Sequence, residues 1–175
     1  MSTIERVVKL LINLSEGERS SEFSRQTLAL QRDFDAYQIF QRIDRERKNY
    51  IDEFNIVEFL KNNSIYCTTT EARIMLSFYD SNYDANLNYL EFLNMILSDS
   101  NFSLKRLSKI KIGYNSSNIL PFDVEYSLTR FFERELELAK AVEMMTSEIN
   151  NRHDFNVLDI YSLIQGNENF ISRER

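Results

Sequence analysis

Residues 80–91 read D-S-N-Y-D-A-N-L-N-Y-L-E, and oxygen-bearing side chains stand at the first, third, fifth, ninth and twelfth positions. The backbone carbonyl of the seventh residue can supply one more oxygen. The six residues are Asp80, Asn82, Asp84, Asn86, Asn88 and Glu91. A hard cation of the size of Ca²⁺ binds about six to eight oxygens, and a twelve-residue loop can deliver them from one local stretch. The spacing therefore predicts a Ca²⁺ site.

The roles within this loop follow from position. Glu91 would close the shell with both carboxylate oxygens, and Asn88 would act directly or through a water. Leu87 is the apolar residue expected to tuck beneath the loop. The sixth position, where glycine makes the sharp turn, is Ala85. A Cβ at positive φ costs on the order of 1 kcal/mol, which should weaken the site without abolishing it.

Apolar residues recur at helical spacing on both sides of the loop, which predicts a helix–loop–helix unit with one shared apolar side. The residues before the loop are Met75, Leu76 and Tyr79, and those after it are Phe92, Met95 and Ile96. Thr68 and Glu71 form a capping-box pattern at the start of the first of these helices.

The composition favours helices throughout. Among 175 residues there are three Gly and one Pro, so we expect an all-α fold. The net charge of −6 argues against a nucleic-acid binder, which needs a broad basic face. The chain has no glycine-rich phosphate loop, HExxH motif or nucleophile elbow, so we expect no enzymatic activity.

The cysteine count and the length of the apolar runs indicate in which cellular compartment the protein is expected. Cys67 is the only cysteine, which excludes an intrachain disulfide and favours a reducing compartment. No apolar run reaches membrane-spanning length, and the first residues lack the pattern of a secretory signal. The expected location is the cytoplasm or an intracellular structure, with no membrane partner.

Residues 1–33 are expected to form N-terminal helices. Ser2 and Glu5 make a capping box, and apolar residues at helical spacing continue to Gly17. Residues 20–32 are mostly polar, so they predict a surface helix.

A second loop-like stretch, residues 44–55, reads D-R-E-R-K-N-Y-I-D-E-F-N and follows a helix for which Asp33 is the expected N-cap. Asp44 precedes Asp80 by 36 residues, so the two loops can lie side by side with Ile51 facing Leu87 in a short β bridge. This first loop has Lys48 at the fifth position and Asn55 at the twelfth. No metal is expected there.

Together, residues 34–98 resemble a paired EF-hand of the calmodulin-like superfamily, in both loops, the four helices and the spacing between them. The resemblance implies a domain over residues 34–100 with a degenerate first loop and an intact second loop that holds Ca²⁺.

Residues 101–124 are expected to be a basic linker, because basic residues come without an intervening acid and are followed by Gly113 and Pro121. The basic residues are Lys105, Arg106, Lys109 and Lys111. The linker is either a solvated connection or a docking site for an acidic partner. After it, a helical pattern extends from Glu125 to about Asn150, the longest predicted element, which either packs on the EF-hand pair or binds a partner as a coiled coil.

Residues 125–175 also contain an internal repeat. D-F-N-V-L-D-I-Y-S-L-I from Asp154 aligns with D-F-D-A-Y-Q-I-F-Q-R-I from Asp33, so a further EF-hand unit begins there. Its loop has Gln165, Gly166 and Asn167 where acids would stand, so no calcium is expected. Either a longer protein or a helix of another chain would complete this unit, and the first is the favoured expectation. The whole arrangement is similar to tandem EF-hand proteins of protist cilia and flagella.

Two functions are consistent with these patterns. One is a calcium-binding module that changes the apolar groove it presents to a partner protein. The other is a calcium-independent structural component of a cytoskeletal or axonemal assembly. His153, the only histidine, lies beside Asp154 and is expected to be a capping or surface residue rather than a catalytic base.

Overall fold

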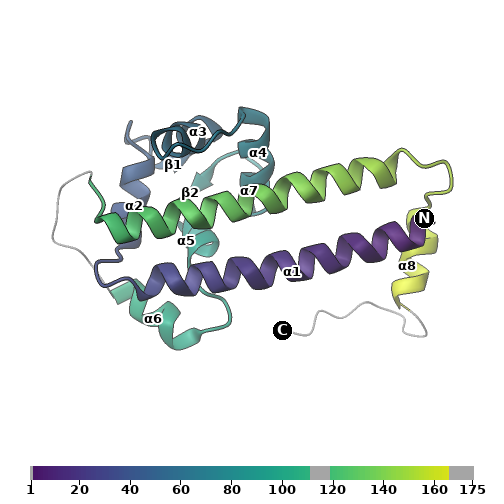
Figure 1. The fold of residues 1–175 in the computed structure, drawn as a ribbon, viewed down its shortest axis with the longest axis horizontal. Coiled ribbons are helices and arrows are strands. Elements are labelled where there is room, and N and C mark those ends of the chain that lie inside the picture. The colour runs from purple at the N-terminus through teal and green to yellow at the C-terminus, as the bar shows by residue number, and fades with distance from the viewer. Residues whose placement is uncertain (1, 111–118, 166–175) are drawn as a thin grey trace.

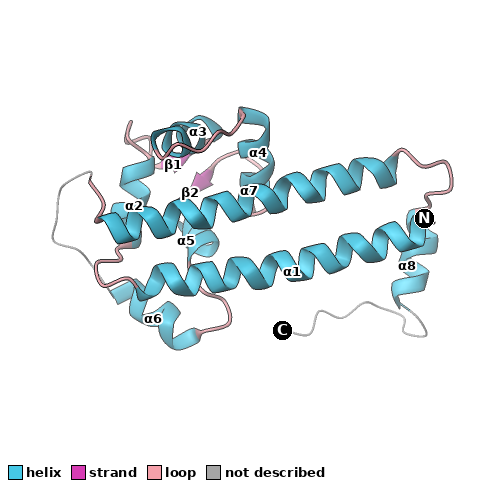
Figure 2. Cartoon of the chain, in the orientation of Figure 1, coloured by secondary structure: helices cyan, strands magenta, loops and turns pink. Residues whose placement is uncertain are grey.

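The computed structural model describes residues 2–110 and 119–165, and Lys111, Gly166 and Asn167 lie outside them. These residues are mostly helical, with one short two-stranded sheet, which agrees with the all-α expectation (Figure 2). The elements are α1 (Thr3–Leu30), α2 (Ala36–Ile43), β1 (Tyr50–Ile51), α3 (Glu53–Asn62), α4 (Thr69–Ser77), β2 (Leu87–Asn88), α5 (Tyr89–Ile96), α6 (Phe102–Ile110), α7 (Phe122–Asn150) and α8 (Val157–Gln165). Within the described ranges, no helix combines the length and apolarity needed to cross a lipid bilayer.

Two long helices, α1 and α7, lie side by side and run in opposite directions (Figure 1). They contain 28 and 29 residues, so α7 is the longest element, as predicted. Their contact includes the Nη1 atom of Arg134, which donates to the Ser20 hydroxyl at 2.8 Å. We call this antiparallel pair the hairpin.

Helix α1 differs from the prediction in both length and burial. It begins at the predicted capping box of Ser2 and Glu5 but runs unbroken through Gly17. The second half, predicted to be a surface helix, is substantially buried: Arg25 and Leu28 are 2% and 0% exposed. The prediction failed because the polar residues of this half are buried against α5 and α7 through specific polar contacts rather than through an apolar stripe.

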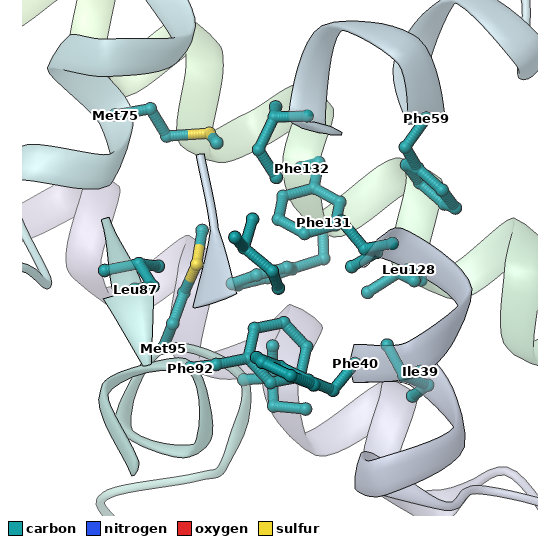
Figure 3. Packing of buried hydrophobic residues seen from close by; sticks show 14 of the residues in the cluster. Ile39, Phe40, Phe59, Met75, Leu87, Phe92, Met95, Leu128, Phe131 and Phe132 are labelled. Carbon is teal, nitrogen blue, oxygen red and sulfur yellow. The ribbon is translucent and has the colours of Figure 1, made fainter. Parts of the chain in front are cut away.

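The short helices α2–α5 pack on one end of the hairpin around a shared apolar core. Phe40 and Phe92 meet edge-on at 5.4 Å between ring centroids, and Phe59 of α3 meets Phe132 of α7 at 5.6 Å. Phe131 lies beside Phe132 in the same core (Figure 3). The core therefore joins the helices that flank both loops to the hairpin.

The two loops are joined by a two-stranded antiparallel sheet. Ile51 pairs with Leu87 and Tyr50 pairs with Asn88, so the predicted bridge is confirmed. Ile51 and Leu87 are fully buried beneath the loops.

One helix start was predicted wrongly. The N-cap of α2 is Asp35, whose carboxylate accepts from the N–H groups of Tyr37 and Gln38, and not Asp33. Two neighbouring aspartates at a helix start both fit an N-cap pattern, and the backbone selects Asp35 by its extended conformation.

Residues 101–124 are not a continuous linker. Helix α6 occupies Phe102–Ile110, and α7 already begins at Phe122. Asn101 starts α6 by accepting the N–H of Leu104 at 2.9 Å, and Leu104 is buried. The run of basic residues and the Gly and Pro after it favoured a linker, although four of the nine residues of α6 are apolar.

Gly17 is the point of close approach in the hairpin. A Cβ built on Gly17 would come within 2.4 Å of Leu138 Cδ1. Leucine has a high helix propensity, so Gly17→Leu tests packing rather than helix formation. We expect a loss of about 1–3 kcal/mol in the free energy of unfolding, measured by urea denaturation, because the site is overpacked. Leu138→Ala in the same chain should recover part of this loss, and additive effects of the two substitutions would contradict the contact.

Candidate functional site

Residues 80–91 form the loop between α4 and α5, and the structure gives its backbone two left-handed residues. Tyr83 and Ala85 have φ of 60° and 64°. Ala85 thus adopts the conformation that the sequence position required of a glycine, at a cost on the order of 1 kcal/mol. The loop therefore forms its turn with Ala85 in a strained backbone conformation.

Three predicted ligands converge at the start of the loop. Asp80 Oδ1 and Asn82 Oδ1 both accept the N–H of Asp84, at 3.3 and 3.0 Å. Asp80 Oδ2 accepts the N–H of Ala85 at 2.8 Å. The Asp84 carboxylate in turn accepts the N–H of Asn86 at 2.9 Å. The oxygens of Asp80 and Asn82 therefore face the same point, and Asp84 lies beside them.

Glu91 is turned toward the loop but is already hydrogen-bonded. One carboxylate oxygen accepts from the Ser81 N–H at 3.0 Å and the Ser81 hydroxyl at 2.7 Å, and the other accepts from the Asn88 N–H at 3.1 Å. Burial disfavours its charge, but these hydrogen bonds outweigh burial and lower the pKa of Glu91. Asn88 Oδ1 caps α5 by accepting the N–H groups of Leu90 and Glu91.

The arrangement assembles part of the predicted ligand set. Asp80, Asn82 and Asp84 lie together, whereas Glu91 and Asn88 are engaged in bonds at the start of α5. Within residues 2–110 and 119–165, no three acidic, histidine or cysteine side chains are grouped closely enough to form a metal site. The donor chemistry of the loop nevertheless suits a hard cation, because every side chain in the set offers oxygen.

The neighbouring loop, residues 44–55, holds a cation of its own. The Lys48 ammonium contacts Asp52 at 2.5 Å and Glu46 at 3.3 Å, so the fifth position reaches the ninth and the third. The Asp44 carboxylate accepts the N–H groups of Lys48 and Asn49, at 2.9 and 2.7 Å. The sequence predicted a positive charge in a ligand position, and in the structure this charge pairs with Asp52 and Glu46.

Burial disfavours the charged form of this ammonium, but Asp52 and Glu46 raise the pKa of Lys48 above its ordinary value. The pKa of Asp52 is lowered, because the Lys48 contact outweighs the effect of burial. The first loop therefore needs no metal to satisfy its carboxylates.

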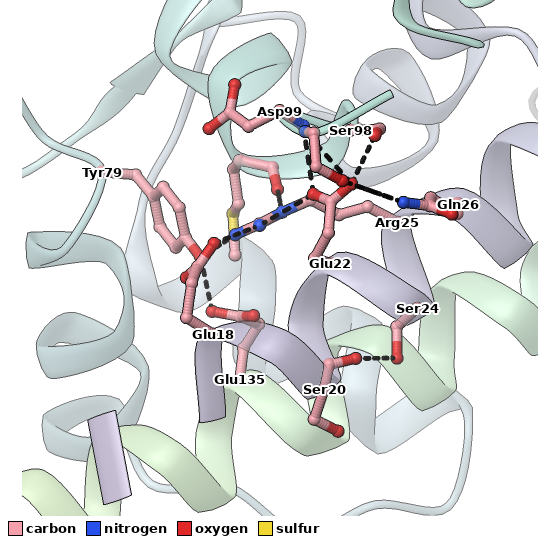
Figure 4. Close-up of polar contacts among 12 residues, drawn as sticks. Glu18, Ser20, Glu22, Ser24, Arg25, Gln26, Tyr79, Ser98, Asp99 and Glu135 are labelled. Carbon is pink, nitrogen blue, oxygen red and sulfur yellow. Dashed lines mark hydrogen bonds and ion pairs between the residues drawn. The ribbon is translucent and has the colours of Figure 1, made fainter. Parts of the chain in front are cut away.

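A buried arginine connects the segments on both sides of residues 80–91 to the hairpin. Arg25 Nε donates to the backbone carbonyl of Met95 in α5 at 2.8 Å, and Nη2 donates to the hydroxyl of Tyr79, which directly precedes the loop, at 2.8 Å (Figure 4). Tyr79 then donates to Glu135 of α7 at 2.6 Å. Glu18 accepts from Arg25 Nη1 at 2.7 Å. One guanidinium thus joins both sides of the loop to α1.

The pKa directions in this cluster follow from burial and charge. Burial raises the pKa of Tyr79, and the charge of Glu135 raises it further, so the hydroxyl stays protonated as a donor. Burial also raises the pKa of Glu135, although the hydrogen bonds from Ser21 and Tyr79 act in the opposite direction.

A second polar contact anchors the segment after α5. Glu22 accepts from the hydroxyls of Ser98 and Ser100, from Gln26 and from the N–H of Asp99. Burial disfavours the charge, but these donors prevail and lower the pKa of Glu22 to about 2. Glu22 thereby fixes the exit from α5 on the hairpin.

Sequence reasoning missed Arg25, Glu22 and Tyr79 as connecting residues. The only sequence signal is that Glu18, Glu22 and Arg25 are three or four residues apart on one helix, which places them on one face. That pattern is equally typical of a solvated face, and the partners on α5 and α7 are distant in sequence.

The other candidate residues are structural. Cys67 is buried, and burial raises the pKa of its thiol. His153 is exposed, as expected. In the basic segment, Lys105 pairs with Asp99 at 2.7 Å, which leaves less charge for an acidic partner. The side chain of Lys109 lies outside the described residues, as does Lys111.

Comparison of the chain with known protein families, characterised proteins and solved structures finds no match.

Lys48→Met keeps the aliphatic stem and removes the ammonium. We expect a loss of about 0.5–1.5 kcal/mol in the free energy of unfolding, because the hydrogen bond to Asp52 is lost in a half-buried site. Lys61→Met, at an exposed position of α3, is the matched control and should change stability little. Equal effects of both substitutions in urea denaturation would exclude a specific role for the tethered charge.

Glu22→Gln tests the anchor after α5. The folded-state pKa of about 2 lies below the ordinary value of 4.5, so the charge stabilises the fold above pH 4.5 and this stabilisation is lost as the pH falls through about 2. At neutral pH we expect the variant to be less stable by about 1–3 kcal/mol. Urea denaturation at several pH values should show this difference shrinking toward pH 2, whereas a constant difference would refute the assignment.

Proposed function

We propose that this chain is a non-enzymatic calcium-binding adaptor of the EF-hand type, with Ca²⁺ held by residues 80–91 and another protein as its partner. The observation that carries the proposal is the pairing of two twelve-residue loops through Ile51 and Leu87, with Asp80, Asn82 and Asp84 converging in one of them. Paired loops of this kind support each other's backbone, so a single ligating loop can be held in shape by a non-ligating neighbour.

The ligand set would consist of the side chains of Asp80, Asn82, Asp84 and Glu91 and the carbonyl of Asn86. Asn88 would act through a water, because its oxygen already caps α5. Glu91 would exchange its bonds to Ser81 and Asn88 for a bidentate contact. When bound, Ca²⁺ would supply positive charge to carboxylates that are otherwise satisfied by backbone N–H groups.

Two features set the expected strength. Ala85 has a strained conformation in this loop, and a single ligating loop gains no cooperativity from its neighbour. We therefore place the affinity in the range of calcium sensors, with a Kd on the order of 1–10 μM.

A second function, a calcium-independent structural component of a cytoskeletal or axonemal assembly, is favoured by a different observation. Lys48 already neutralises the first loop, and Arg25 ties the helices on both sides of the second loop to the hairpin. Both contacts stabilise one arrangement without any ion.

Calorimetry distinguishes a Ca²⁺-binding loop from a loop that binds no ion. Wild type should bind Ca²⁺ with a micromolar Kd, and Glu91→Gln should weaken binding at least about tenfold because the bidentate ligand is lost. Glu16→Gln, at an exposed position of α1, is the control and should bind like wild type. The absence of heat and of a shift in melting temperature in the wild type would leave only the structural function.

Binding alone does not establish a switch. A hydrophobic dye that fluoresces on exposed apolar surface should respond to Ca²⁺ in the wild type and not in Glu91→Gln. Uptake of Ca²⁺ without a change in dye fluorescence would mean that the ion only stabilises the fold.

A further inference from the structure

The internal repeat extends backward through the two long helices. We call two residues equivalent when they are separated by 121 positions, the distance from Phe34 to Phe155. Some apolar and basic positions then coincide along α1 and α7, whereas others, such as Ile12 and Glu133 or Leu14 and Glu135, do not. The equivalent pairs include Val7 and Leu128, Leu10 and Phe131, Leu11 and Phe132, Leu28 and Ile149, Lys9 and Arg130, and Arg19 and Lys140.

Equivalent residues are related by an approximate two-fold axis across the hairpin. Gly17 and Leu138 are equivalent, and they touch each other near the middle of the two helices. Two equivalent residues can meet in this way only where the axis passes between them. The register of the hairpin therefore coincides with the register of the repeat.

Two small cavities on the hairpin, of about 200 and 140 Å³, are related by the same approximate two-fold axis. Six of the seven residues that line one cavity are equivalent to residues that line the other. One lining includes Lys9 and Met145, and the other includes their equivalents Arg130 and Ser24. The symmetry is thus a property of the side-chain packing as well as of the backbone.

The short helices that follow the long ones start at equivalent places. The N–H of Tyr37 donates to Asp35 at 2.9 Å at the start of α2, and the N–H of Leu158 donates to Asn156 at 3.0 Å at the start of α8. Asp35 and Asn156 are equivalent, as are Tyr37 and Leu158. Helix α8 therefore occupies the place in the second half that α2 occupies in the first.

The halves differ in what covers the long helix. Thr129 and Phe132 of α7 are 7% and 0% exposed, with Phe59 of α3 against Phe132. Their equivalents on α1, Val8 and Leu11, are 47% and 46% exposed. In the second half, the described residues include the counterpart of α2 but none of α3 or α4.

We propose that the distal face, formed by Ile4, Val8 and Leu11 of α1, binds a partner protein that supplies an EF-hand-like helix pair of the α3–α4 type. The approximate symmetry specifies the chemistry of this occupant: a helix with an aromatic residue against Leu11, and an acid against Arg19. The acid follows from α4, where Glu71 pairs with Lys140, the equivalent of Arg19, at 2.9 Å. The inference goes beyond calcium binding and does not require it.

A tethered probe tests the distal face. The probe is a second copy of residues 34–98, which carries Phe59 and Glu71, joined to the C-terminus of the full chain by a flexible glycine–serine linker. The tether gives an effective concentration of about millimolar. Backbone amides of residues 4–12 should exchange with deuterium at least about tenfold more slowly in the fusion than in the unfused chain.

Four variants of the fusion sharpen the test. Leu11→Glu should restore fast exchange at residues 4–12, whereas Leu30→Glu, an exposed leucine at the other end of α1, should leave the protection unchanged. Arg19→Glu should reduce the protection, and Glu71→Lys in the tethered copy should recover it.

The proposal is overturned if residues 4–12 exchange equally fast with and without the probe, including the case in which circular dichroism shows the tethered copy unfolded. It is also overturned if the unfused chain sediments as a dimer and these amides become protected with rising protein concentration, since a second copy would then cover the face.

Discussion

A buried guanidinium lies where the hairpin meets the helices on both sides of the loop formed by residues 80–91. Arg25 is 2% exposed and contacts Met95, Tyr79 and Glu18. A buried guanidinium left without its partners costs several kcal/mol. The hydrogen bonds of Arg25 therefore hold α4 and α5 on the hairpin in addition to the apolar core. If either helix moved, Arg25 would need another hydrogen-bond acceptor.

The carboxylates of the two loops have different partners. In the first loop, the ammonium of Lys48 contacts Asp52 and Glu46. In the second, none of the ion pairs among the described residues involves Asp80, Asp84 or Glu91. Backbone N–H groups satisfy these carboxylates without cancelling their charge. In the part of the chain that the structure describes, the two loops thus differ in that only the first has a lysine ammonium in contact with its carboxylates.

Local patterns were predictable and long-range contacts were not. The capping box of Thr68 and Glu71 depends on residues three positions apart, and the bridge between Ile51 and Leu87 follows from the fixed separation of the loops. Gly17, by contrast, suggested a helix end, because its helix propensity is low by about 1 kcal/mol. Its role in the close approach to α7 depends on Leu138, which is far away in sequence.

The two halves of the repeat also differ at the position of an ion pair, and this difference concerns the distal face. In the first half Arg42 of α2 contacts Glu125 of α7 at 2.5 Å, an ion pair that is largely shielded from solvent. The residue equivalent to Glu125 is Ile4, so a charged position on α7 corresponds to an apolar one on α1. An apolar residue at this place is compatible with burial, because it needs no partner for a charge.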